Sequence, residues 1–347
     1  MADVRCLVTG GAGFIGSWVT RGLVARGIPV VVQDSFIQYF SPLHPMAALY
    51  HRYIDERLRD FQGKVQLVRG DTRHQHEIRR LIAEHRPTHV IHLAALPLPE
   101  LSNEYTEEAV ESIVTGTINL LEAMRDLRCG QRFVYASSSM VYGDFERTPV
   151  DEEHPKRPKS IYGGAKLCGE IMVETFARRF GLDYAIVRPT AVYGPTDVNR
   201  RVSQIFVENA LLGQPLVMEG GADVELDFTY VEDAADGIIR AAFEPGGRNE
   251  VFNISRGETC TLGQYAQILS SLVPNVQVVT QPRDLTRPKR GALDIRKAQR
   301  LLGYAPRHSL EEGLRAYVAF VRQQLQDLSH GASPSPAVAP QSRPARA

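Results

Sequence analysis

The sequence of 347 residues has little cysteine, no surplus of charge of one sign and no long apolar run. The four cysteines (Cys6, Cys129, Cys168 and Cys260) lie far apart without a CxxC spacing, which favours neither a zinc site nor a disulfide framework. The 40 basic and 40 acidic side chains cancel to a net charge of zero, which argues against general nucleic-acid binding and against a polybasic membrane anchor. No window approaches the roughly 18 consecutive apolar residues of a membrane-spanning helix. The N-terminus enters a strand-like run at once, so we expect no signal peptide and a reduced, cytoplasmic protein.

Short apolar runs alternate with longer helical patterns over the first 180 residues. The runs expected to be strands are 5–9, 29–33, 65–68, 89–93, 132–136 and 184–187. This alternation predicts an α/β fold with a doubly wound parallel sheet in a core of residues 1–180, to which a strand within 184–194 returns. Residues 195–329 are predicted to form mainly a smaller substrate-binding lobe. Residues 330–347 are rich in Ala, Ser and Pro and lack aromatic side chains, which predicts a disordered tail.

A glycine turn joins the first expected strand to the helix expected over 16–26. Gly10, Gly13 and Gly16 have the spacing GxxGxxG, which lets the backbone turn sharply and approach a pyrophosphate closely. The N-terminus of the following helix would offer free N–H groups and the positive end of its dipole to the same anion. Asp34 follows the second strand, where a carboxylate accepts hydrogen bonds from the adenosine ribose and repels a 2′-phosphate. The sequence therefore predicts a dinucleotide site that prefers NAD to NADP.

A tyrosine, a lysine and a serine form a second candidate site. Tyr162 and Lys166 are four residues apart at the start of an expected helix, so their side chains share one face. Because an ammonium favours a neighbouring phenolate, we expect Lys166 to lower the pKa of Tyr162 and make it a base near neutral pH. Ser138 follows the strand 132–136, at the sheet edge where the active groups of such folds gather. A serine-hydrolase site is not favoured, because the sequence has no GxSxG turn.

These residues belong to a longer series of motifs, through which the chain resembles the extended short-chain dehydrogenases/reductases. Within that group it is similar to the NAD-dependent nucleotide-sugar epimerase/dehydratase family, over about residues 3–325. The shared segments are GGAGFIG (10–16), Asp34, GDTR (70–73), HLAA (92–95), SSSMVYG (137–143), YGGAK (162–166), VRPTAVYGP (187–195) and FTYVEDAADG (228–237). The resemblance implies a Rossmann-type fold, NAD as cofactor and a nucleotide-sugar substrate.

The resemblance also implies a role for each matching residue. Tyr162 would be the catalytic base and acid, Lys166 a ligand of the nicotinamide ribose, and Ser138 the catalytic Ser/Thr. Asp71 would hold the adenine amino group. Further cofactor contacts are expected from Phe14, Ile15, Thr72, Leu93, Ala94 and Ala95, and substrate contacts from Ser138, Ser139, Met140, Arg188 and Arg287. No metal is expected, since His74 and His76 lack a third ligand.

The residues after Ser138 separate the members of the resembled family. Its dehydratases place an Asp-Glu pair here, and related decarboxylases keep a Glu three residues before the glycine. This chain has Ser139 and Met140 instead, which disfavours both reactions. The leading interpretation is a 4-epimerase for a UDP-sugar, of the glucose/galactose or the uronic-acid type. The alternatives are a nucleotide-sugar dehydrogenase or keto-reductase, a decarboxylase, and a non-catalytic NAD-binding sensor.

Three positions depart from the family pattern, and one interface is implied by it. Ile113 replaces the usual Asn, Ala191 stands in the segment whose Asn helps to bind substrate, and Leu226 replaces an Arg. The last two lie in the expected substrate-nucleotide site. The family commonly forms homodimers through a four-helix bundle, and the corresponding helices here would be 106–127 and 162–180. Cys168 on the second of these helices is expected to be a buried small apolar residue.

Overall fold

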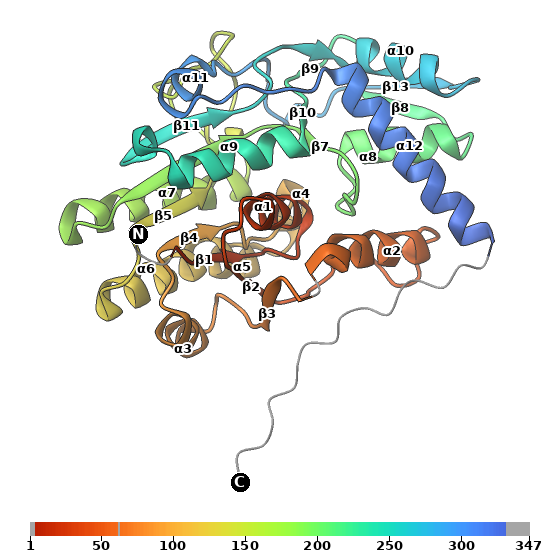
Figure 1. The fold of residues 1–347 in the computed structure, drawn as a ribbon. Helices are drawn as coiled ribbons and strands as arrows, with labels where there is room; N and C mark the ends of the chain where they lie inside the picture. Colours follow the sequence, from red (N-terminus) through yellow and green to blue (C-terminus); the bar gives the residue numbers. More distant parts are fainter. Residues whose placement is uncertain (1–3, 62, 331–347) are drawn as a thin grey trace.

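Seven parallel strands form the central sheet of the computed structural model, which describes residues 4–61 and 63–330 (Figure 1). The strands are β1 (Cys6–Thr9), β2 (Val30–Asp34), β3 (Val65–Arg69), β4 (His89–His92), β5 (Arg132–Ala136), β6 (Tyr184–Pro189) and β11 (Glu250–Ile254). Their order across the sheet is β11-β6-β5-β4-β1-β2-β3, and every neighbouring pair is parallel. The predicted doubly wound parallel sheet is confirmed.

Helices cover both faces of this sheet. One layer consists of α1 (Phe14–Ala25), α9 (Val231–Phe243) and α11 (Arg296–Leu302), and the other of α3 (Gln75–His85), α6 (Gly116–Leu127) and α7 (Ile161–Phe180). Side chains alternate between the two layers along each strand: in β1, Cys6 and Val8 enter the first core and Leu7 the second. Figure 1 shows α1 and α9 side by side, although they are far apart in the sequence.

A second apolar core lies beside the sheet. It is built from α2 (Ala47–Leu58), α8 (Val202–Leu211), α10 (Leu262–Leu272) and α12 (Leu310–Ser329). Three small strand pairs border it: β8 (Leu216–Glu219) with β13 (Val278–Gln281), β9 (Glu225–Leu226) with β12 (Cys260–Thr261), and β7 (Val192–Tyr193) with β10 (Thr229–Tyr230). Short 3-10 turns cover Arg59–Phe61, Ser139–Val141 and Pro245–Gly247.

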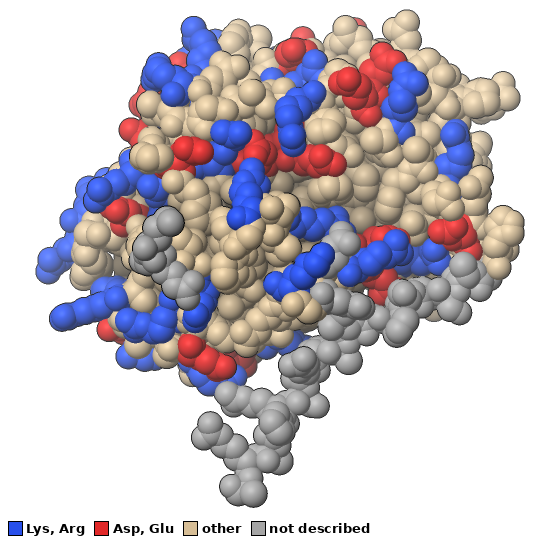
Figure 2. Space-filling view, in the orientation of Figure 1, with Lys and Arg blue, Asp and Glu red and all other residues tan. Residues whose placement is uncertain are grey.

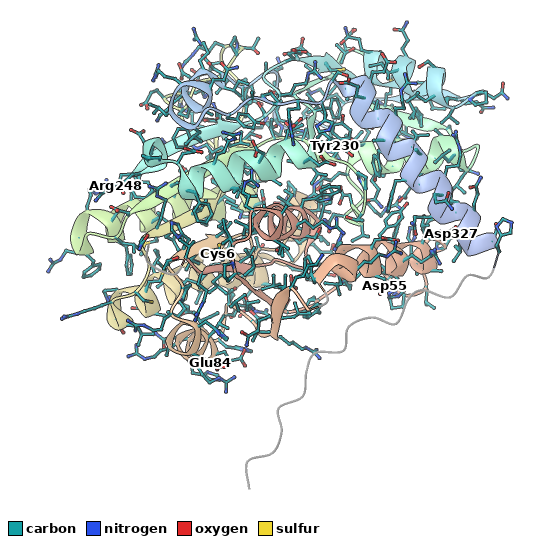
Figure 3. All side chains as sticks on the ribbon, in the orientation of Figure 1. Cys6, Asp55, Glu84, Tyr230, Arg248 and Asp327 are labelled. Atoms are coloured by element: carbon teal, nitrogen blue, oxygen red, sulfur yellow. The ribbon has the colours of Figure 1, made fainter. Side chains whose placement is uncertain are left out.

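The two lobes exchange segments, which differs from the expected boundary at residue 195. α9, β11 and α11 come after that boundary and nevertheless complete the sheet and its helical layer. In the other direction, α2 leaves the sheet region and packs against α12, where Arg52 donates to Asp327 at 3.1 Å. Figure 3 shows Asp327 near the end of α12, above the helix that carries Asp55. Both faces of a parallel sheet must be covered, and α9 and α11 supply part of one helical layer.

The helix expected over 106–127 is divided into three parts. α4 (Pro99–Glu104) precedes α5 (Thr106–Val110), a π-helical turn (Glu111–Thr115) and α6. α6 lies so close to the turn after β3 that a Cβ at Gly116 would be 2.6 Å from the hydroxyl of Thr72. Asn119 fixes the contact by donating to the carbonyl of Thr72 at 2.8 Å. The helix therefore holds a wall of the cavity described below.

Two further expectations concern a membrane-spanning helix and the C-terminal tail. Across residues 4–61 and 63–330, none of the helices combines the length and the apolar character that spanning a membrane requires. Basic and acidic side chains both occur across the face drawn in Figure 2. The predicted disordered tail lies, apart from His330, outside the described residues.

Candidate active site

A cavity of about 1050 Å³ lies between the sheet and the second core. The glycine turn, the ends of β2, β4 and β5, the start of α7 and the segment after β13 all contribute to its wall. It contains every expected site residue except Arg188. The expected residues that line it are Gly10, Gly13, Phe14, Ile15, Gly16, Asp34, Asp71, Thr72, Leu93, Ala94, Ala95, Ser138, Ser139, Met140, Tyr162, Lys166 and Arg287.

The glycine turn has the geometry of an anion cradle. Gly10 has φ +69°, and a Cβ at Gly16 would collide with the carbonyl oxygen of Gly10. Gly13 precedes α1 and supplies no side-chain cap, so the first N–H groups of the helix have no acceptor within it. These free donors and the closeness of the glycine backbone fit the pyrophosphate of NAD.

Asp34 is fixed at the end of β2 by two backbone donors. Its Oδ2 accepts from the N–H of Ala12 at 3.0 Å and its Oδ1 from the N–H of Phe36 at 2.8 Å. Burial raises the pKa of this carboxyl, and these hydrogen bonds oppose the rise. Arg57, on α2, stands beside it and donates twice to the carbonyl of Thr196, at 3.1 and 2.6 Å. Sequence reasoning missed Arg57, because only the fold brings α2 to the cavity.

Asp71 occupies the position expected for an adenine contact, and its carboxylate is oriented by a neighbour. Arg73 donates to Oδ2 through Nε at 3.0 Å and Nη2 at 2.7 Å. Burial raises the pKa of Asp71, but the hydrogen bonds from Arg73 outweigh it, so the net shift is downward. The residue is therefore an ionised acceptor near neutral pH.

Tyr162, Lys166 and Ser138 meet where β5 ends and α7 begins. Ser138 and Tyr162 both line the cavity, and the Ser138 hydroxyl is one of the groups that oppose the rise in the pKa of Tyr162. Lys166 Nζ lies 5.8 Å from the centre of the Tyr162 ring and donates to the carbonyl of Ala136 at 2.6 Å. Ser160 caps α7 by accepting from the N–H of Gly163 at 3.1 Å, which fixes the first turn of the helix. The predicted grouping of these three side chains is thus present.

The electrostatic expectation for this group requires a correction. Burial raises the pKa of Tyr162, and the groups that oppose the rise are the Arg201 guanidinium and the Ser138 hydroxyl rather than Lys166. Burial also lowers the pKa of Lys166 to about 7, with Glu170 opposing that shift. The sequence gives the spacing of the two groups but not the desolvation that both experience. Arg201 lies 5.7 Å from the Phe14 ring and pairs with Asp197 at 2.8 Å.

Arg188 does not face the cavity, so the expected substrate contact is wrong for this residue. Its guanidinium binds both oxygens of Glu170, at 2.9 and 2.7 Å, and the hydroxyl of Tyr142 at 2.9 Å. Glu170 in turn accepts from the hydroxyl of Ser137 at 2.5 Å. Glu170 is one helical turn beyond Lys166, so Arg188 fixes the carboxylate that follows Lys166 on α7.

Arg287 lines the cavity, but its charge is already paired. It contacts Glu219 at 2.8 Å and Glu100 at 3.4 Å and is largely exposed. Arg290 lies in the same wall and makes no hydrogen bond or ion pair with its side chain among the described residues, and burial lowers its pKa to about 10. Arg290 is therefore better placed than Arg287 to neutralise an added anion. Ala191 and Leu226 also line the cavity, whereas Ile113 is buried elsewhere.

Two remaining expectations concern a metal site and Cys168. No group of three or more His, Cys, Asp or Glu side chains is arranged to hold a metal in the described part of the chain. Cys168 is exposed, so the expectation that it is buried is wrong. It belongs to the outer face of α7, whereas Lys166, Glu170 and Val173 belong to the buried face.

Fold and site together define the class of this protein. A Rossmann-type sheet, a glycine turn at a helix N-terminus, and a Tyr-Lys-Ser group at the edge of the sheet are those of an extended short-chain dehydrogenase/reductase. The sequence model described as the NAD dependent epimerase/dehydratase family matches residues 6–255. The chain belongs to this family, whose cofactor is NAD.

Known proteins similar to this chain cover nearly all of it. UDP-glucuronate 4-epimerase 4 of Arabidopsis thaliana is 30% identical over 334 residues, which span 91% of this chain and 74% of that protein. The crystal structure of UDP-glucose 4-epimerase from Thermotoga maritima with UDP-glucose has a TM-score of 0.83 at 30% identity, covering 93% of this chain and 100% of the other. UDP-glucuronic acid 4-epimerase from Bacillus cereus, in complex with UDP-glucuronic acid and NAD, has a TM-score of 0.83 at 28% identity, covering 92% and 99%.

Proposed function

We propose that this protein is an NAD-dependent 4-epimerase of a UDP-sugar, either of the glucose/galactose or of the uronic-acid type. The observation that carries the proposal is the grouping of Tyr162, Lys166 and Ser138 in one cavity that also contains the glycine turn. The similarity to UDP-glucose and UDP-glucuronate 4-epimerases supports this choice of substrate.

The side chains divide the work at the sugar C4 hydroxyl. The hydroxyl of Ser138 holds the substrate oxygen, and Tyr162, in its phenolate form, accepts the proton of that oxygen as the C4 hydrogen leaves. NAD, when bound, supplies the acceptor and later the donor of hydride. After the 4-keto sugar has turned over in the cavity, Tyr162 returns the proton to the oxygen, and C4 has the opposite configuration. Burial lowers the pKa of Lys166 to about 7, and its Nζ lies 5.8 Å from the centre of the Tyr162 ring.

The residues next to Ser138 disfavour the other reactions of the family. Ser139 is buried, and Met140 has no proton to donate or accept. Elimination of water and assisted decarboxylation each need an acid or base at the sugar. Among the described residues, Glu170 is the carboxylate nearest to Lys166 along α7, and it is bound to Arg188 rather than open to the cavity. A net dehydrogenase remains the alternative with the same side chains.

The central experiment compares Tyr162→Phe with the wild type on a panel of UDP-sugars, with products identified by NMR. We expect Tyr162→Phe to abolish epimerisation and to keep its bound NAD, because the ring remains and only the proton carrier is lost. Tyr105→Phe is the matched control, since Tyr105 is exposed and lies outside the cavity lining. Full activity of Tyr162→Phe would overturn the mechanism, and net NADH formation by the wild type would favour the dehydrogenase.

We also propose a homodimer through α5, α6 and α7. Ile161, Cys168 and Ile171 follow one face of α7 and are exposed, and Val110 is exposed on α5. Apolar side chains at this helical spacing favour packing against a second copy of the same helices. Ile171→Asp should shift the protein towards monomer in analytical ultracentrifugation, whereas Leu285→Asp, at an exposed apolar residue elsewhere, should not. A wild-type monomer at micromolar concentration would contradict the proposal.

We further infer a reducing, cytoplasmic location. All four cysteines are free thiols in the structure, which supports this inference. A disulfide between any two of them in protein isolated without reductant would count against it.

A further inference from the structure

The chain after β2 crosses one end of the cavity before it enters α2. Ser35, Phe36, Ile37, Gln38, Tyr39 and Phe40 all line the cavity. Asp34 sets the direction of this segment through its bond to the N–H of Phe36, a non-glycine residue with φ 59°. The segment therefore starts at the carboxylate expected to hold the adenosine ribose.

The far end of the segment is tied to the opposite wall by one side chain. Tyr39 donates its hydroxyl proton to Oε1 of Glu108 on α5 at 2.9 Å. Both residues line the cavity, and 69 residues separate them in the sequence. Burial, and then Glu108, raise the pKa of Tyr39, so its hydroxyl stays protonated and remains a donor.

The acceptor is itself held by the residues of the expected adenine site. Arg73 lies 3.7 Å from Glu108 while it binds the carboxylate of Asp71. Asp71, Arg73, Glu108 and Tyr39 thus form a continuous series of polar contacts across the adenosine end of the cavity. An adenosine bound between Asp34 and Asp71 would lie next to this series, because Asp71 belongs to it.

We propose that Tyr39 and Glu108 form a latch that closes over the adenosine end of NAD and slows its dissociation. NAD as the ligand follows from the family, and the benefit of slow dissociation rests on the proposed function. An epimerase returns its cofactor to the starting state in every cycle, so it gains nothing from releasing it. The hydrogen bond must open for NAD to leave, and it is charge-assisted, which makes opening more costly than for a neutral pair.

The test measures NAD dissociation without any sugar. Holoenzyme is mixed with excess NADH, and the replacement of bound NAD is followed by fluorescence. Tyr39→Phe and Glu108→Ala should each dissociate NAD roughly 10- to 150-fold faster, as loss of one hydrogen bond to a charged group predicts. The double variant should be no faster than the faster single variant, because both changes remove the same contact.

Matched controls come from neighbouring residues outside the series. Tyr105→Phe and Glu107→Ala alter exposed side chains of the same types in the same part of the chain, and their dissociation rates should stay within twofold of the wild type. Thermal melting of each apoprotein checks that the fold is intact. If Tyr39→Phe and Glu108→Ala also stay within twofold of the wild type, or if either slows dissociation, the latch is overturned. If the variants release NAD faster but the wild type epimerises no UDP-sugar, the proposed function is overturned and the latch is still supported.

Discussion

The buried ion pair between Arg188 and Glu170 allows a quantitative test of the structure. The two side chains are 1% and 3% exposed and are joined by two hydrogen bonds, at 2.9 and 2.7 Å. Arg188→Met keeps most of the side-chain volume but leaves the Glu170 carboxylate buried without its cation. Breaking a buried pair in this way costs about 3–5 kcal/mol of the free energy of unfolding. Because a whole protein has a margin of about 5–15 kcal/mol, the loss should be large in a urea titration at pH 7.

An exposed pair and a double variant separate the possible causes. Arg147→Met removes a solvent-exposed pair with Asp151 at 2.6 Å, and about 0–1 kcal/mol should be lost. Arg188→Met combined with Glu170→Leu should be more stable than Arg188→Met alone, because no charge is then buried without a partner. A loss below about 1 kcal/mol for Arg188→Met would refute the reasoning. So would a double variant as unstable as the sum of its single changes.

Two further predictions concern a buried acid and the glycine turn. Burial raises the pKa of Glu208 from 4.5 to about 7, so the folded chain binds a proton that the unfolded chain has released. The stability that this group contributes therefore falls as the pH rises from 4.5 through 7. Glu208→Gln should raise the melting temperature at pH 8 and change it little at pH 5, because only at the higher pH does the wild type bury a charged carboxylate. An equal shift of the melting temperature at both pH values would contradict this prediction. Gly16→Ala places a methyl group against the Gly10 carbonyl, and the purified variant should contain no bound NAD when its cofactor is released with acid and measured. Gly164→Ala should keep its NAD, because a Cβ at Gly164 would have no atom within 4 Å. Wild-type NAD content in Gly16→Ala would show that the turn tolerates the extra atom.

The parts of the fold that the sequence predicts are those encoded by neighbouring residues. The strand at 6–9, the glycine turn and the Tyr162–Lys166 spacing are local patterns, and their periodicity is visible without tertiary structure. The exchange of α2 and α9 between the lobes is not local. It depends on which apolar faces remain uncovered after the sheet has formed.

The site residues also divide into those marked by a local sequence pattern and those brought to the cavity only by the tertiary fold. Asp34 and Tyr162 were predictable because each follows directly from a strand or begins a helix. Arg57 and Arg201 reach the cavity only through α2 and the start of α8, and no short motif marks them. Arg188 has the right residue type beside a substrate motif, but it belongs to an inward-facing position of β6, where Glu170 was available to pair with it. The sequence also does not show how far the Tyr162 hydroxyl is desolvated. The expectation that the Lys166 charge lowers the pKa of Tyr162 was therefore wrong in direction, because burial raises that pKa.

The packing of α1 against α9 has a consequence for how the chain is made. The helix that follows the glycine turn leaves the ribosome long before its partner α9, which begins only at Val231. Until then Val19 and Leu23 have no helical neighbour on that side, and the sheet still lacks β11. The nascent chain therefore exposes this apolar surface while the residues between the two helices are being made, and such a surface is prone to aggregation.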